Sequence, residues 1–236
     1  DLRIKTGLIK KALIYTEKHS IVLLSLFPKQ EMVSFGEKLT VPVMNWILLS
    51  LLPMSLVRRS HYPSLSAANG QFMLFVAAEY RTYRFHEQVK DKNVEDIHIM
   101  RLIKKLGHKG STLLSNGGVE CRMYRSFKEG IFGFTRSMFA FFGGSGITLF
   151  FFTVFTTFGI IFAAFGMSWF FALIYGIVAL LMMAIIAQMI WEAVRTLILL
   201  APLQQLVFFV MVVESFRRRS KGVNIWKGRI IKYESQ

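Results

Sequence analysis

The longest uncharged run in this chain, residues 137–190, contains no Asp, Glu, Lys, Arg or His. A helix needs about 20 predominantly apolar residues to cross the hydrocarbon core of a bilayer, so this run is long enough for two crossings. We expect the two helices over residues 142–165 and 170–190, with a short turn between them. The chain is therefore predicted to be a multi-pass integral membrane protein.

A third apolar run, residues 196–213, could cross the membrane or lie in its interface. It contains Pro202, Gln204 and Gln205, which make it the weakest candidate for a span. Basic residues precede the first predicted span and also follow this run, and positive-inside bias favours the cytoplasmic side for both groups. Because that placement requires an even number of crossings, we predict that the third run lies at the interface or packs against the soluble part.

The net charge of +15 raises nucleic-acid binding as a possible function. However, the basic residues do not form one patch interleaved with exposed aromatics, as a nucleic-acid-binding face requires. Many lie beside apolar runs, as Arg58 and Arg59 do, where they are typical anchors at an anionic membrane surface. The single cysteine, Cys121, excludes an intrachain disulfide, and the five histidines show no metal-ligand spacing. We expect a membrane partner and no nucleic acid.

The first 136 residues alternate predicted strands with predicted helices, which favours an α/β soluble part ahead of the membrane helices of residues 137–236. Hydrophobic periodicity and β-branched content decide the individual assignments. We expect helices over 8–19 and 126–139, buried strands over 21–27 and 71–76, a short strand over 119–124, and a turn-rich segment over 107–118.

Residues 41–57 form a shorter apolar run with Pro42 and Pro53 near its ends. At about 17 residues it is shorter than a comfortable span. We favour a helix that lies in the membrane interface beside the soluble part over a true crossing, with Trp46 as an interfacial anchor.

Glu95 and Asp96 form an acidic pair at the front of a predicted helix, with Asn93 as its expected N-cap and Gly107 as its end. In the first turn, exposed backbone N–H groups and the helix dipole favour an ionised carboxylate. One of the pair would then be placed to accept a proton. The alternative is that the two acids only decorate a helix N-terminus, where acids are common.

Five short motifs follow one another in a defined order along the chain. They are Asp1-Leu2-Arg3, Asn69-Gly70-Gln71-Phe72, Glu95-Asp96, Arg122-Met123-Tyr124-Arg125-Ser126 and Trp226-Lys227-Gly228-Arg229. In this order the chain resembles membrane-bound family 2 glycosyltransferases of the carotenoid glycosyltransferase-like branch. The resemblance implies the C-terminal half of a GT-A-type α/β domain followed by transmembrane helices. Asp1 looks like the second Asp of the family's Asp-x-Asp motif, which implies that a nucleotide-binding half precedes this chain.

The resemblance also implies roles for individual residues. Asp1 would hold a divalent metal, Mg²⁺ or Mn²⁺, that neutralises the departing diphosphate. Asp96, with Glu95 beside it, would accept the proton of the acceptor. Arg122 and Arg125 would contact the donor diphosphate, although a juxtamembrane basic pair facing lipid phosphate is the alternative.

The resemblance also implies which residues line the acceptor side: Gly70, Gln71, Phe72 and His86. It further implies that Trp226 and Arg229 belong to a tail motif of the family. Relatives carry Gly-Gly where this chain has Arg84 and Phe85 before His86, which puts the identity of the acceptor in question. By itself, a glycine beside a strand is also explained by close backbone approach.

The leading hypothesis is an inverting, metal-dependent enzyme. It would move a sugar from a nucleotide-diphosphate sugar to a carotenoid or other lipid-like acceptor, on the cytoplasmic side of the cell membrane. A transporter component is a weaker hypothesis, because the two clear spans offer only Gln188 and hydroxyls at membrane depth. A non-catalytic anchor or assembly module is the third.

Overall fold

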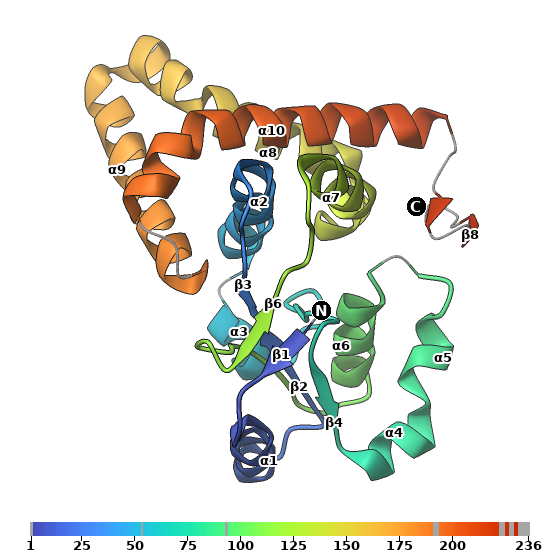
Figure 1. The fold of residues 1–236 in the computed structure, drawn as a ribbon. Coiled ribbons are helices and arrows are strands. Elements are labelled where there is room, and N and C mark those ends of the chain that lie inside the picture. The colour runs from blue at the N-terminus through green and yellow to red at the C-terminus, as the bar shows by residue number, and fades with distance from the viewer. Residues whose placement is uncertain are drawn as a thin grey trace. The chain divides into compact units, whose positions relative to one another are not determined.

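The computed structural model describes residues 2–52, 54–92, 94–190, 194–221, 225–226 and 229–230. Most of these residues are helical, and the strands form small sheets (Figure 1). The chain divides into two compact units, each made of two stretches of sequence. The first comprises Asp1–Glu31 and Leu49–Met123, and the second comprises Met32–Leu48 and Tyr124–Gln236.

Strand β2 (Leu23–Phe27) is central in the first unit, and all of its residues are buried, as its run of apolar residues predicts. It pairs antiparallel with β4 (Met73–Phe75) on one side and parallel with β5 (Gly110–Leu114) on the other. A second small sheet has the order β1-β6-β3, formed by Leu2–Ile4, Val119–Cys121 and Lys29–Gln30. In the described part, the first unit thus mixes helices with small sheets.

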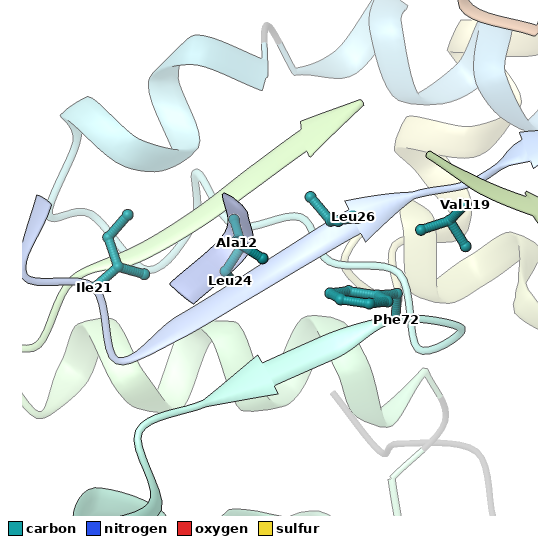
Figure 2. Packing of buried hydrophobic residues seen from close by; sticks show 6 residues of the cluster. All are labelled: Ala12, Ile21, Leu24, Leu26, Phe72 and Val119. Carbon is teal, nitrogen blue, oxygen red and sulfur yellow. The ribbon is translucent and has the colours of Figure 1, made fainter. Parts of the chain in front are cut away.

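The core of the first unit forms around β2. Figure 2 shows six buried side chains of this cluster: Ala12, Ile21, Leu24, Leu26, Phe72 and Val119. Helix α1 (Leu8–His19) contributes Ala12 and has the bounds that its periodicity predicts. Phe72 of the Gly-Gln-Phe motif belongs to this cluster, with 8% of its surface exposed. The Phe72 side chain therefore packs in the core and anchors the Gly-Gln-Phe motif to β2.

The segment over residues 107–118 is turn-rich only at its ends, because β5 lies inside it. A turn with positive φ angles remains at Asn116 and Gly117. Gly107 and Gly110 have other functions. Gly107 ends the preceding helix with a φ of 78°, a left-handed conformation that glycine adopts without strain. Gly110 lies under Met100, and a Cβ atom there would clash with the Met100 sulfur. The glycine thus permits the helix to pack against β5.

Four further helices complete the first unit, and two predicted strands are shorter than expected. The strand over 71–76 is observed as β4 and is only half-buried, and the strand over 119–124 is observed as β6. The helices are α3 (Met54–Arg59), α4 (Ala77–Tyr83), α5 (Phe85–Val89) and α6 (Glu95–Lys105).

The second unit consists mainly of helices, and three of them are long and apolar enough to cross a membrane. Those three are Gly146–Met167, Trp169–Gln188 and Val194–Ser220. They indicate a membrane protein, as the uncharged run predicts. The elements are α2 (Phe35–Leu51, in part), α7 (Phe127–Phe141), α8 (Gly146–Phe162) with its π-helical end η1 (Ala163–Met167), α9 (Trp169–Ile190), α10 (Val194–Ser220), β7 (Ile225–Trp226) and β8 (Arg229–Ile230).

Helix α2 begins well before the apolar run that predicted it and ends before Pro53, which lies outside the described residues. A reciprocal cap explains the start. The Ser34 hydroxyl accepts from the Glu37 N–H at 3.3 Å, and the Glu37 carboxylate accepts from the Val33 and Ser34 N–H groups at 2.9 and 3.3 Å. The predicted single helix over 41–57 is therefore two helices, α2 and the short α3.

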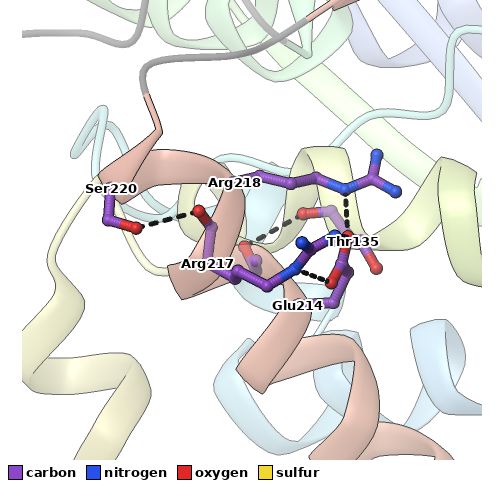
Figure 3. A network of polar contacts seen from close by, with 6 residues as sticks. Thr135, Glu214, Arg217, Arg218 and Ser220 are labelled. Carbon is purple, nitrogen blue, oxygen red and sulfur yellow. Dashed lines mark hydrogen bonds and ion pairs between the residues drawn. The ribbon is translucent and has the colours of Figure 1, made fainter.

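Helix α10 extends the predicted 196–213 run to 27 residues and packs against α7, α8 and α9. Its Ser215 hydroxyl donates to the Thr135 carbonyl of α7 at 3.0 Å. Glu214 binds Arg217 and Arg218 of the same helix, with N–O distances of 2.6 and 2.8 Å (Figure 3). The Arg218 guanidinium also lies 4.6 Å from the ring centre of Phe132 on α7. The basic end of α10 is thus held on α7 by side-chain contacts.

Candidate active site

Asp96 and Glu95 lie in the first turn of α6, as predicted. The expected N-cap, Asn93, lies outside the described residues. Val94 directly precedes the helix with a φ of 57°, and its side chain makes no cap. The Asp96 carboxylate accepts from the N–H of Ile97 at 2.9 Å, a donor that also bonds to the Val94 carbonyl at 3.1 Å.

The second oxygen of Asp96 accepts a hydrogen bond from the Gly70 N–H at 2.8 Å. This contact joins two of the predicted motifs that are 26 residues apart in the chain. A Cβ atom at position 70 would lie 3.5 Å from the carboxylate, an ordinary contact distance. The geometry therefore depends on the backbone N–H of residue 70 and does not require a glycine for space.

Burial raises the pKa of Asp96 above its ordinary value of 3.8. Loss of solvation disfavours the ionised form, and the negative charge of Glu95 acts in the same direction. The N–H groups of Gly70 and Ile97 lower the pKa, but they do not offset the burial. A carboxylate with a raised pKa is a better proton acceptor near neutral pH than an ordinary aspartate.

A chain of side-chain amides connects the Gly-Gln-Phe segment to β6. The Gln71 side-chain amide donates to the Cys121 sulfur at 3.0 Å, and the Gln30 side-chain amide donates to Oε1 of Gln71 at 3.2 Å. Cys121 is the last residue of β6, and Arg122 follows it directly. The first unit thus brings Gly70, Gln71 and Asp96 together and ties Gln71 to the strand that leads into the predicted arginine.

The sequence motifs include Asn69, but sequence reasoning assigned no role to Asn69 or to Ser25, and the two residues hold this segment in place. Asn69 lies 5% exposed beside the centre of β2, where it exchanges two hydrogen bonds with Ser25. Its side-chain oxygen also accepts from the Gln71 N–H at 2.9 Å. The available signal was Ser25 itself, a lone hydroxyl in an apolar strand whose buried polar group needs a partner.

His86 lies elsewhere in the first unit, in a cluster of rings. Its Nδ1 atom is 2.8 Å from the Tyr80 hydroxyl, and its ring contacts those of Tyr80 and Phe75. Within the described residues, these contacts do not include the Gly70–Asp96 pair. The acceptor-side role of His86 therefore stays a prediction that these contacts do not support.

Asp1, Arg125, Trp226 and Arg229 have no described contact with Asp96. Asp1 lies outside the described residues. Arg125 belongs to the second unit, where its N–H donates to the Glu129 carboxylate at 2.8 Å. Trp226 and Arg229 are paired in the short β7–β8 ladder of the same unit.

The described residues do not by themselves form a metal centre. Among them, no group of three or more His, Cys, Asp or Glu side chains is placed to hold a metal ion. Both oxygens of Asp96 already accept backbone hydrogen bonds. The described arrangement therefore fits a proton-accepting carboxylate better than a metal ligand.

Comparisons with protein-family models, with curated proteins and with solved structures found no match. The resemblance to family 2 glycosyltransferases therefore rests on the order of the motifs alone.

Proposed function

We propose that this chain carries the acceptor side of a membrane-associated, inverting glycosyltransferase, with Asp96 as the general base. The donor would be a nucleotide-diphosphate sugar, and the acceptor a lipid-like molecule such as a carotenoid, reached at the cytoplasmic face of the cell membrane. The three apolar helices support a membrane setting in which such an acceptor is available.

The contact between Asp96 and Gly70 is the observation that carries this proposal. It joins the two motifs to which the resemblance assigns the base and the acceptor side. The N–H of Gly70 fixes the orientation of the carboxylate, while burial raises its pKa. A fixed carboxylate with a raised pKa suits the removal of a proton from a hydroxyl as that hydroxyl attacks. Glu95, which is exposed in the same turn, adds negative charge nearby.

Arg122 is the proposed contact for the donor diphosphate, because a guanidinium can bind phosphate oxygens through two parallel hydrogen bonds. Arg125 is the second candidate for this contact. We assign no step to a metal ion, because the described residues do not fit one and Asp1 lies outside them. When bound, a divalent cation would supply charge neutralisation at the diphosphate.

The test is transfer of radiolabelled glucose from UDP-glucose to a hydroxylated carotenoid by the purified full-length protein in lipid nanodiscs. Asp96→Asn keeps the size and the hydrogen-bond acceptor for Gly70 but cannot take up a proton. We expect it to lower turnover about 100-fold or more, the range typical of a general base. Asp91→Asn, an exposed acid on the loop before α6, is the control and should retain turnover.

Turnover of Asp96→Asn within a few-fold of the unmodified protein would remove Asp96 from the mechanism. Equal loss in Asp91→Asn would show that the effect is a general one of charge.

A further inference from the structure

An apolar groove lies in the second unit where α2, α9 and α10 meet. Its lining includes Val43 and Trp46 of α2, Met183 and Ile186 of α9, and Ala201 and Gln204 of α10. Apart from Gln204 and its neighbour Gln205, the lining side chains are predominantly apolar. The groove therefore favours a hydrocarbon ligand and offers polar contacts only on the α10 side.

The conformation of Gln204 follows from a proline in α2. Pro42 has no N–H, so the Lys38 carbonyl four residues earlier loses its helical partner. The Gln204 amide donates to that carbonyl at 2.9 Å. Because a carbonyl can only accept, the NH₂ group of Gln204 must face Lys38. The side-chain oxygen of Gln204 keeps its capacity to accept, and it accepts no hydrogen bond from the part of the chain that is described.

The surroundings of the groove indicate where a ligand comes from. Helix α9 has apolar side chains all round, and many are exposed, including Leu173, Ile177 and Leu180. A helix of this kind is surrounded by lipid. Because α9 is long and apolar enough to cross a bilayer and its exposed side chains are apolar, hydrocarbon chains are the molecules expected beside the groove that it lines.

We propose that this groove binds a long-chain alcohol from the bilayer. Its hydrocarbon chain would lie between α2, α9 and α10, and its hydroxyl would donate to the Gln204 side-chain oxygen. A hydroxyl that donates to Gln204 keeps its donated hydrogen bond on leaving water, whereas a chain without a donor would leave this oxygen unpaired. This proposal does not depend on the proposed sugar transfer, because the alcohol can bind in the groove whether or not the protein transfers a sugar.

The test is photocrosslinking of the full chain in detergent micelles with hexadecanol that carries a diazirine in mid-chain. The methyl ether of the same probe cannot donate a hydrogen bond and serves as the matched ligand. We expect the alcohol to label the peptides around Trp46 and Ile186 several-fold more than the exposed face around Leu180. The ether should label the groove several-fold less than the alcohol does.

Ala201→Phe fills the groove and should reduce its labelling several-fold. Leu199→Phe, on the same helix but 68% exposed and outside the groove, should leave labelling unchanged. If Ala201→Phe does not elute as a folded protein, competition by excess unlabelled hexadecanol in the unmodified chain replaces it. Equal labelling of the groove and the exposed face, or no loss on filling or competition, would overturn the proposal. Equal labelling by alcohol and ether would overturn the role of Gln204.

Discussion

The Ser25 hydroxyl accepts a hydrogen bond from the Asn69 N–H at 2.7 Å and donates one to the Asn69 carbonyl at 3.1 Å. Ser25 is fully buried at the centre of β2, and Asn69 is 44 residues away in the chain. The pair fixes the backbone directly before Gly70, whose N–H binds Asp96. A core strand thus determines where the predicted acceptor segment meets the predicted base.

Ser25→Ala should therefore destabilise the protein, because it leaves the buried Asn69 N–H without its partner, while the Asn69 carbonyl still accepts from the Phe72 N–H at 3.3 Å. The expected loss is about 1–3 kcal/mol, the usual cost of an unsatisfied buried group. Thermal unfolding in detergent measures it, with the exposed Ser55→Ala as the control. Equal midpoints for the two variants would mean that the Asn69 N–H finds another partner.

The raised pKa of Asp96 predicts how stability depends on pH. A carboxyl whose pKa is higher in the folded state than in the unfolded state favours folding when it is protonated. This stabilising contribution is fully present below the pKa of Asp96 in the unfolded state, about 3.9. It is lost as the pH rises through the pKa of Asp96 in the folded state. Asp96→Asn should thus gain stability relative to the unmodified protein as the pH rises from 4.

Unfolding midpoints of Asp96→Asn and of the unmodified protein between pH 4 and pH 8 test this expectation. The exposed Asp91→Asn provides the baseline. A constant difference between Asp96→Asn and the unmodified protein across this range would show that burial does not raise the pKa of Asp96.

Lys104 predicts a second pH dependence, of a different origin. Its side chain is 6% exposed on α6, its amino group donates to the Leu65 carbonyl, and burial lowers its pKa to about 8. In the unfolded chain Lys104 keeps its proton up to a pKa of about 10.4, so between pH 8 and pH 10.4 the unfolded state binds more protons than the folded state. The free energy of unfolding should therefore rise over this range. The full amplitude is roughly 3 kcal/mol, from 1.36 kcal/mol per pKa unit.

Lys104→Met should abolish that rise, and Lys105→Met, at the exposed neighbouring position, should keep it. Unfolding midpoints measured from pH 7 to pH 10.5 distinguish the two. A rise that persists in Lys104→Met would assign it to another group.

The path of α10 is the fourth testable expectation. From Gln204 onward its buried side chains recur at steps of three and four, and the NH₂ groups of the two central glutamines donate inside the unit: Gln204 to the Lys38 carbonyl and Gln205 to the Thr157 hydroxyl. Since both NH₂ groups have partners inside the unit, the polarity of the two residues alone does not decide whether α10 crosses the bilayer. Positive-inside bias still predicts that both basic ends lie on one side.

Single cysteines introduced as Lys128→Cys and Lys221→Cys in a Cys121→Ser background should react with an impermeant maleimide from the same side of sealed vesicles. Ser168→Cys, in the turn between α8 and α9, should react from the opposite side and serves as the control. Reaction of Lys128→Cys and Lys221→Cys from opposite sides would show that α10 crosses the membrane.

The features predicted correctly from sequence are those that depend on neighbouring residues. The length of the uncharged run predicted α8 and α9, and a 3.6-residue hydrophobic period predicted α1. Ser126 followed by Glu129 marks the observed start of α7, where the Ser126 hydroxyl accepts a hydrogen bond from the Glu129 N–H. The first-turn position of Asp96 followed from the same local reasoning. Ser34 and Glu37 form an equally local signal for the start of α2, and it was overlooked.

The tertiary structure alone decided which distant residues meet. The segment that became β5 contains glycines typical of turns, and it is a strand because it pairs in parallel with β2, more than 80 residues earlier in the chain. The bond between Asp96 and Gly70 likewise depends on β2 holding Asn69 through Ser25. Local composition carries no information about such partners, because pairing across a sheet and burial of polar groups are satisfied only once the chain has folded.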